Sequence, residues 1–301
     1  MMKSVKFKHN NIDMAGNLYL PEGMDESRKY PAIVCVHPGG GVKEQTSGLY
    51  AENLSKQGFI TLAFDASYQG ESGGEPRLLE DPSERVEDVH CAVDYLTTLP
   101  YVDVDNIGVL GICAGGGYAI NASQSNHRIK AVAGISSVDV GGLFRAQGKE
   151  ASLATIQAAN TQRTAEANGA ELQYIPWVPN SLEEIDENTT TLMREAYDYY
   201  RTSRAQHPNS TNRFLFRSVE KILTFSAFSN LDTLLTQPLL IIAGAEADTL
   251  MFSEEAYEKA ASEDKELFLI EGATHVDMYD IPKYVNPALE KLTIFFNKNL
   301  K

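Results

Sequence analysis

Cysteine, tryptophan and histidine are all scarce in this chain of 301 residues, which has three, one and six of them respectively. The cysteines, Cys35, Cys91 and Cys113, are odd in number and widely spaced. They form neither a disulfide framework nor the ligand spacing of a zinc site. We therefore expect free thiols in a reducing compartment and no bound metal.

Long apolar runs and excess positive charge are also lacking. No run approaches the roughly 20 apolar residues that a membrane-spanning helix needs. The basic start, MMKSVKFKHN, is followed by polar residues and is not typical of a secretory signal. Twenty-six Lys and Arg against 41 Asp and Glu leave a net charge of -15, which repels nucleic-acid phosphates and anionic lipids. We expect a cytoplasmic protein that binds a small molecule, and neither nucleic acid nor a membrane.

Hydrophobic residues make up 43% of the chain, enough for a large core, and their spacing predicts an α/β fold. Alternation over residues 4–20 predicts an antiparallel hairpin. Short apolar runs then alternate with amphipathic stretches, which predicts buried strands of a mostly parallel sheet. Asp81-Pro82-Ser83-Glu84 is typical of a helix start, and 287–296 is amphipathic. The predicted strands are 32–36, 60–64, 107–112, 131–135, 239–244 and 267–270, and all of them except 267–270 are expected to be buried.

The segment 140–236 interrupts this rhythm. It reads as helices and loops rich in aromatic residues, among them Trp177. We expect 1–139 and 237–301 to form the α/β core, with 140–236 as a helical lid that covers a pocket and brings Trp177 to the substrate. The alternative is a helical subdomain whose aromatic residues form only its own core.

The strongest motif is GICAGGG at 111–117, directly after the predicted strand and before a helical stretch at 118–122. This pattern predicts a nucleophile elbow with Cys113 in the position that serine usually takes. Glycines at 111 and 115 are needed because side chains there would collide with the strand and the helix. The helix N-terminus is expected to lower the pKa of the thiol. The alternative is that Cys113 is a small buried hydrophobic residue.

A thiol nucleophile needs a base, and His275 is the best candidate. It lies in a loop just past the predicted strand 267–270 and follows Cys113 along the chain, as the histidine of this fold does. His127 precedes a strand, at the wrong edge of a parallel sheet, and His207 lies in a polar loop of the inserted segment. We expect His275 to exchange protons with the thiol.

A carboxylate is expected to orient the imidazole. Asp248 follows the buried run 239–244 by four residues, which places it at the same sheet edge as His275. Glu246 is the competing candidate, and an ordinary solvated acidic loop is the alternative for both.

The loop His37-Pro38-Gly39-Gly40-Gly41 follows the strand 32–36. A glycine amide there, together with the Ala114 amide, would form an oxyanion hole. We name Gly39 and Gly40 as donors, although the sequence alone leaves Gly41 open. His37 is expected to be structural. The Lys-Ser/Thr pair of a phosphate-binding loop is missing, which argues against nucleotide binding.

The loop 65–74, DASYQGESGG, borders the same edge of the predicted sheet. Tyr68 could line the substrate pocket. Its neighbouring glycines and serines are equally explained by a tight surface loop.

Together, the elbow GICAGG, the HPGGG and DASYQGESGG loops, Val104-Asp105-Asn106-Ile107 and the GATHVDMYD loop resemble the α/β-hydrolase superfamily, and within it the dienelactone-hydrolase-related branch with a cysteine nucleophile. The resemblance covers 1–138 and 237–301. It implies a triad of Cys113, Asp248 and His275. The inserted segment departs from compact dienelactone hydrolases, so their lactone substrate is not carried over.

These observations predict a carboxylic ester hydrolase. It would cleave an ester, lactone or thioester of a largely apolar small molecule through an acyl-enzyme, and no dinucleotide fingerprint or ligand spacing calls for a cofactor. Two alternatives stay open. Fungal polyketide transferases are similar in layout, which suggests an acyltransferase using the same triad, and a non-catalytic protein could use Cys113 as a redox-sensing thiol.

Overall fold

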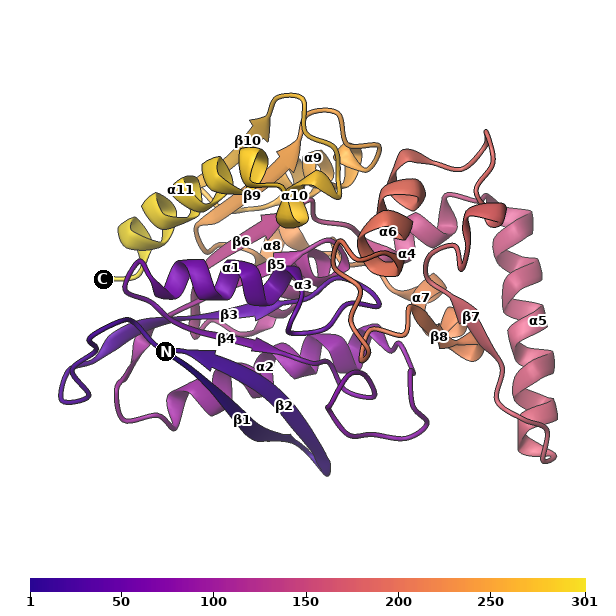
Figure 1. Ribbon diagram of the computed structural model, residues 1–301, viewed down its shortest axis with the longest axis horizontal. Helices are drawn as coiled ribbons and strands as arrows, with labels where there is room; N and C mark the ends of the chain where they lie inside the picture. The colour runs from indigo at the N-terminus through magenta and orange to yellow at the C-terminus, as the bar shows by residue number, and fades with distance from the viewer.

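The computed structural model describes all of residues 1–301 and has a twisted eight-stranded sheet at its centre (Figure 1). The strand order is β1-β2-β4-β3-β5-β6-β9-β10. β1 pairs with β2, and β2 with β4, in antiparallel fashion, while every other pairing in this sheet is parallel. The predicted α/β-hydrolase fold is therefore confirmed. The strands are β1 (Met2–His9), β2 (Ile12–Tyr19), β3 (Tyr30–Val36), β4 (Ile60–Phe64), β5 (Val102–Ile112), β6 (Ile129–Ile135), β9 (Leu239–Gly244) and β10 (Lys265–Ile270).

Two strands differ from their predicted limits. β5 begins at Val102, five residues earlier than predicted. The added residues include the polar stretch around Asp105, which has no apolar pattern that would predict a strand. β10 begins at Lys265, two residues before the predicted start, and it is partly exposed because it lies at the edge of the sheet with β9 as its only neighbour. The other predicted strands are present at or within two residues of their expected bounds.

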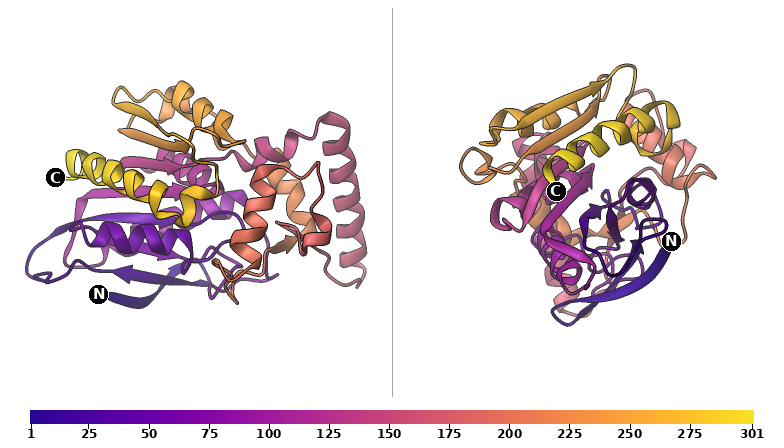
Figure 2. Two further views of the ribbon diagram at one scale, coloured as in Figure 1. Left: turned by 45° about the horizontal axis from the view of Figure 1, so that its top comes forward. Right: turned by 90° about the vertical axis from the view of Figure 1, so that its left-hand side faces the viewer.

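Helices cover both faces of the sheet (Figure 2). Alternate side chains of β3 illustrate the division, since Val34 belongs to one hydrophobic cluster and Cys35 to the other. One face carries α2 (Pro82–Thr97), α3 (Ala114–Ser125), α8 (Leu231–Leu234) and α9 (Leu250–Lys259), and the other carries α1 (Thr46–Ser55), α10 (Asp277–Asp280) and α11 (Pro282–Asn299).

The predicted start of α2 is confirmed in detail. The Asp81 side chain caps the helix by accepting a hydrogen bond of 3.1 Å from the Ser83 amide, and Pro82 occupies the first helical position. α11 begins five residues before the predicted helix, with Pro282 at its first turn and Pro287 inside it. No helix combines the length and the apolar character needed to cross a membrane.

The segment 140–236 lies between β6 and β9 in the chain and extends from one end of the sheet (Figure 1). We call it the insert. Its two three-residue strands are too short to leave an alternating pattern in the sequence, and its last part, including Phe228 and Leu231, packs into the sheet's own core. Its elements before α8 are α4 (Val140–Arg145), α5 (Lys149–Ala167), β7 (Tyr174–Pro176), η1 (Leu182–Glu184), α6 (Thr191–Arg201), β8 (Arg213–Leu215), η2 (Phe216–Ser218) and α7 (Val219–Thr224).

A buried histidine ties the N-terminal hairpin to α2. His9 donates from Nδ1 to Asp88 Oδ1 at 2.7 Å, with the Ser67 hydroxyl 3.0 Å from the same nitrogen. Its Nε2 lies 3.4 Å from a Glu84 carboxylate oxygen. The hydrogen bond to Asp88 raises the pKa of His9 in spite of its burial, and the nearby Glu84 and Glu87 charges act in the same direction.

We expect the variant His9→Gln to lose stability in a pH-dependent way. Because folding raises the pKa of His9, its contribution is complete below the unfolded-state pKa of about 6.5 and is lost as the pH rises through the folded-state value. Urea unfolding should show a deficit of about 1–3 kcal/mol near pH 5.5 that shrinks at alkaline pH. The control His127→Gln should show no such trend, and a deficit in His9→Gln that stays constant with pH would contradict the ionic role.

Candidate active site

Cys113 lies in a strained turn between β5 and α3. Its backbone has φ 58° and ψ -125°, a conformation that a non-glycine residue adopts only when its surroundings impose it. The Cys113 amide donates to the Ile135 carbonyl at 2.9 Å, and the Cys113 carbonyl accepts from the amides of Gly116 and Val138 at 2.9 and 3.0 Å. These three bonds fix the nucleophile elbow that the sequence predicts.

The glycines around the elbow allow backbone segments to approach one another. A Cβ on Gly111 would stand 2.2 Å from the Gly115 carbonyl oxygen, and a Cβ on Gly115 would stand 2.5 Å from the carbonyl oxygens of Val36 and His37. In both cases the atoms met are backbone atoms, which cannot rotate away. The predicted steric reason for these glycines is confirmed.

The thiol of Cys113 is partly exposed and packs against all three hydrophobic clusters of the protein. Burial raises the pKa of this thiol. Hydrogen bonding from the Tyr279 side chain and from the amides of Ala114 and Gly39 opposes the rise without reversing it. The predicted lowering of the Cys113 pKa by the helix N-terminus is therefore wrong in its net direction, because desolvation is the larger effect. A base must take up the proton.

Two backbone amides converge on the sulfur, those of Ala114 and Gly39. Of the other two loop glycines, Gly41 already donates its amide to the Pro38 carbonyl at 3.1 Å. Gly40, with φ 71°, brings its backbone against Trp177, whose ring lies 2.8 Å from where a Cβ would stand. This arrangement favours the amides of Ala114 and Gly39 as the two donors of the predicted oxyanion hole. Gly40 instead packs against Trp177.

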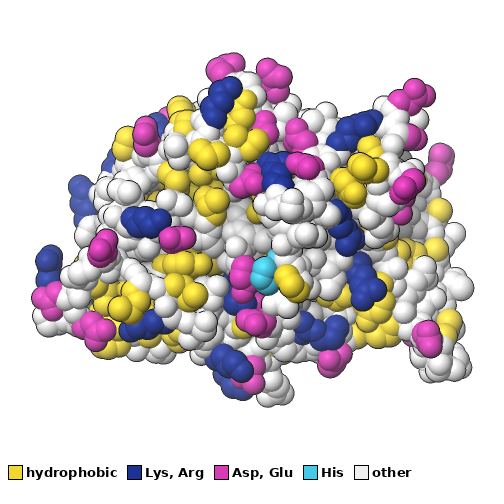
Figure 3. All heavy atoms as spheres, viewed as in Figure 1, with side chains coloured by type: hydrophobic (Ala, Val, Ile, Leu, Met, Phe, Trp, Pro, Cys, Tyr) yellow, Lys and Arg dark blue, Asp and Glu magenta, His cyan; other side chains and the backbone are white.

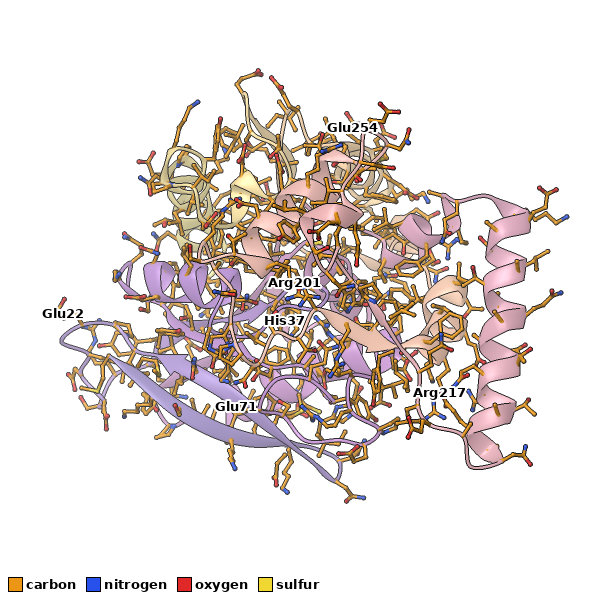
Figure 4. The ribbon with its side chains drawn as sticks, turned by 45° about the vertical axis from the view of Figure 1, so that its right-hand side comes forward. Glu22, His37, Glu71, Arg201, Arg217 and Glu254 are labelled. Carbon is orange, nitrogen blue, oxygen red and sulfur yellow. The ribbon has the colours of Figure 1, made fainter.

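His37 holds the glycine loop in place (Figure 4). Its Nδ1–H donates to the Pro38 carbonyl at 2.6 Å, its Nε2 accepts from the Ala66 amide at 3.1 Å, and its carbonyl accepts from Arg85 at 2.9 Å. Burial lowers the pKa of His37, which keeps the ring neutral. Both ring nitrogens are occupied, so His37 has no lone pair left for catalysis.

His275 is fully buried behind Cys113. Its Nδ1 lies 2.5 Å from the Thr249 hydroxyl, and its Nε2 lies 3.2 Å from the Tyr279 hydroxyl. Burial lowers the pKa of His275 to about 3, so the ring is neutral at physiological pH and can accept a proton. No hydrogen bond joins His275 directly to Cys113, since the Tyr279 hydroxyl is the group at Nε2.

The structure does not bring Asp248 to His275. The Asp248 side chain is exposed, and its Oδ2 accepts a hydrogen bond of 3.0 Å from the Leu192 amide in the first turn of α6. Glu246 is exposed as well and makes no side-chain hydrogen bond. Thr249, the residue after Asp248, occupies the place at Nδ1 that we expected a carboxylate to take. The sequence did not predict this role for Thr249, because only acidic side chains were considered as partners of His275.

A small cavity of about 60 Å³ opens in front of Cys113, with room for about two water molecules. Trp177 lines it, as predicted. Tyr68 is not among its lining residues, so the prediction that Tyr68 lines the pocket is wrong. Apart from Gly39, the thirteen lining residues are all hydrophobic: Cys113, Ala114, Val138, Val140, Leu143, Trp177, Val178, Leu192, Met193, Ala196, Tyr200 and Tyr279. The outer surface in Figure 3 contrasts with this lining, since acidic and basic side chains are interspersed there.

Helix α6 of the insert is attached to the loops that carry the polar groups of the site. Besides the bond from Leu192 to Asp248, the Thr274 hydroxyl donates to Glu195 of α6 at 2.7 Å. Just after α6, Arg204 donates to the Asp280 carboxylate at 2.6 Å. The insert therefore touches both the loop after β9 and the loop after β10.

Known proteins share this architecture. The family model described as "Serine aminopeptidase, S33" (Hydrolase_4) matches residues 28–281. The chain belongs to this hydrolase family. The family is named for a serine enzyme, whereas this chain has Cys113 in the turn between β5 and α3.

Some known proteins resemble this chain over its full length, and others over only part of it. The uncharacterized protein YcjY of Escherichia coli is 43% identical over the whole of both chains. The crystal structure of hypothetical protein PA2218 from Pseudomonas aeruginosa superposes with a TM-score of 0.92 at 34% identity, covering 100% of this chain and 94% of that one. Thiohydrolase aneE of Aspergillus aculeatus is 34% identical over 41% of this chain and 37% of its own.

The variant Gly111→Ala tests the close packing of the elbow. The added methyl group meets the Gly115 carbonyl, so we expect a loss of about 2–4 kcal/mol in urea unfolding. Gly73→Ala is the matched control, because a Cβ there would stand no closer than 3.5 Å to any atom, and its effect should stay within about 0.5 kcal/mol. Equal stability of the two variants would show that the turn can relax.

Proposed function

We propose that this hydrolase cleaves an ester, lactone or thioester of a largely apolar small molecule, through an acyl-enzyme formed on Cys113. The observation that carries the proposal is the position of the thiol. It stands at a strained elbow, faces an apolar cavity and receives two backbone amides. A relative named as a thiohydrolase supports the thioester part, and the motifs that resemble the dienelactone-hydrolase-related branch support the cysteine nucleophile.

In the proposed reaction the thiolate of Cys113 attacks the substrate carbonyl carbon, and a carbon–sulfur bond forms. The negative charge that develops on the carbonyl oxygen is stabilised by the amides of Ala114 and Gly39. His275 holds the proton taken from the thiol and returns it to the leaving group. Water, activated by the same imidazole, then releases the acid and regenerates the thiol.

The insert is proposed to act as a lid. The cavity in front of Cys113 is too small for more than about two waters, and α6 supplies Leu192, Met193 and Ala196 to its wall. An apolar acyl chain can enter only if these side chains move outward. The apolar lining favours uncharged acyl groups, since a charge there would lose its hydration.

A second candidate, acyl transfer to an alcohol, is favoured by the apolar lining of the same cavity, which offers water few hydrogen-bonding partners next to the acyl-enzyme. The two activities differ in product. With an added alcohol, a transferase releases the ester of that alcohol, whereas a hydrolase releases the free acid.

The first test is burst kinetics with p-nitrophenyl esters of graded chain length. We expect one equivalent of p-nitrophenol per active site in the first turnover, lost in Cys113→Ala and in His275→Ala by about a thousandfold or more in rate. Cys91→Ala removes a thiol that lies on α2, away from the cavity, and should leave the burst unchanged. Unchanged turnover in Cys113→Ala would refute the proposal.

A second test separates the two candidates for orienting His275. In the structure Thr249 is the group at Nδ1, so Thr249→Val should lower kcat/KM by about 10–100-fold. Asp248→Asn keeps an acceptor for the Leu192 amide and should cost less than about threefold. A loss near 10⁴-fold in Asp248→Asn would instead establish the Cys113–His275–Asp248 triad that the sequence predicts, with Asp248 leaving Leu192 during turnover.

A further inference from the structure

An open groove of about 630 Å³ lies next to the cavity in front of Cys113, and Tyr200 lines both spaces. Its volume is that of a small-molecule site. Its wall comes from the end of α6 and from the segment that follows α6 in the insert. The polar residues that line it together with Tyr200 are Arg201, Gln206, His207, Ser210 and Thr211.

The groove borders the glycine loop of the active site. The Ser210 hydroxyl donates to the Gly40 carbonyl at 2.6 Å, and the Tyr200 hydroxyl lies 3.4 Å from where a Cβ on Gly41 would stand. Figure 4 shows Arg201 over the loop that carries His37, which begins the same glycine segment. A molecule whose carbonyl carbon meets Cys113 therefore has a route past Tyr200 into the groove when α6 moves outward.

Three residues of the groove have buried polar atoms that bond to nothing else in the protein. These atoms are the Tyr200 hydroxyl, Arg201 Nε and the Thr211 hydroxyl, and Tyr200 as a whole is only 4% exposed. A buried donor without an acceptor weakens the folded state, so each such group calls for an explanation. A ligand that brings hydrogen-bond acceptors supplies one, and movement of α6, which carries both Tyr200 and Arg201, would present them to it.

The groove is positively charged in a strongly acidic protein. No Asp or Glu lines it, although the chain has a net charge of -15. Arg201 donates from Nη2 to the neutral Asn180 side chain at 2.9 Å and to no carboxylate. The Nδ1 atom of His207 accepts from the Asn209 amide at 3.3 Å, which places the ring proton of neutral His207 on Nε2 as a further donor.

Two carboxylates act on these residues from outside the groove. Glu71, whose charge is felt at His207, is paired with Lys43 at 2.7 Å. Glu184, whose charge is felt at Arg201, accepts from the Asn180 amide at 2.9 Å. Arg201 therefore keeps uncommitted N–H groups, which suit an anionic oxygen group such as a carboxylate.

We propose that this groove binds the leaving group of the substrate and that the leaving group carries an anionic oxygen group. The inference rests on the proposed function, in which the acyl part lies in the apolar cavity and its carbonyl carbon meets Cys113. The leaving group passes Tyr200, whose hydroxyl donates to it, and its negative charge meets Arg201. The two ends of the substrate are thus recognised by opposite chemistry, on the two sides of one tyrosine.

The test uses two hexanoyl thioesters that differ only in the leaving group, 3-mercaptopropionate and its neutral amide, 3-mercaptopropionamide. The two have nearly the same shape, and only the first is charged. Turnover is followed by the loss of thioester absorbance. Binding is measured separately in Cys113→Ala, which forms no acyl-enzyme, through the fluorescence of Trp177, the only tryptophan of the chain. Its ring lies against Gly40, whose carbonyl binds Ser210 of the groove.

In Arg201→Gln we expect kcat/KM for the carboxylate thioester to fall about tenfold and that for the amide to change less than about twofold. The Kd values in the Cys113→Ala background should change in the same ratio. The intrinsic reactivity of each thioester is common to all variants, so the change in their ratio reports the groove. Arg201→Lys keeps the charge and should retain part of the preference. Arg194→Gln, which removes an exposed charge from the same helix outside the groove, should leave the ratio unchanged.

A ratio that is the same in the wild type and in Arg201→Gln would overturn the groove as the site of an anionic leaving group. An equal loss for both thioesters would overturn it too, because a merely structural role of Arg201 has that effect. Cleavage of both thioesters without discrimination would leave the proposed function standing alone. A wild type that cleaves neither, while Cys113→Ala binds the carboxylate form through Arg201, would refute the proposed function and support the binding site.

Discussion

The backbone turn at Cys113 is the constraint on which the rest of the site depends. The strained φ and ψ of this residue are imposed by hydrogen bonds to β6 and to the segment that follows it, and by glycines that let three backbone segments touch. The turn directs the thiol out of the sheet at the point where all three hydrophobic clusters meet. Placing the sulfur there removes much of its contact with water, which raises its pKa, so a thiol nucleophile at this position would need an assisting base.

Burial sets the electrostatics of the whole region. Cys113, His275 and Tyr279 all have pKa values displaced toward the neutral form, because charge is costly where water is excluded. These groups are therefore uncharged at rest, and in the proposed reaction charge would be created as a pair, thiolate with imidazolium. Fixed dipoles from Ala114 and Gly39 then stabilise the negative member without reorganising.

The sequence predicted most of the core and part of the site. Strands such as β4 and β9 were found with their exact ends because buried parallel strands are short, continuous apolar runs, and the start of α2 was found from its capping residues. The partial exposure of the edge strand β10 could not be predicted, because periodicity does not reveal how many neighbours a strand has. The pairing of β7 with β8 left no pattern in two segments of three residues.

The site predictions divide in a similar way. Cys113 and His275 follow strands that end at one edge, so the topology alone brings them near each other. The immediate partners of His275 depend on side-chain directions over distances of about 3 Å, which neither spacing nor propensity encodes. Thr249 therefore takes the place expected for Asp248 at Nδ1, the Tyr279 hydroxyl lies at Nε2, and Tyr68 does not line the cavity.

The attachment of α6 has a consequence for selectivity. Leu192 and Glu195 bind the loops after β9 and β10, and the same helix closes the cavity wall. A ligand that pushes α6 outward must break these bonds and thereby alters the surroundings of Asp248 and Thr274 at the same moment. If the insert acts as the proposed lid, ligand entry and rearrangement of the loops after β9 and β10 are energetically coupled, which would favour ligands whose fit offsets the cost of breaking these bonds.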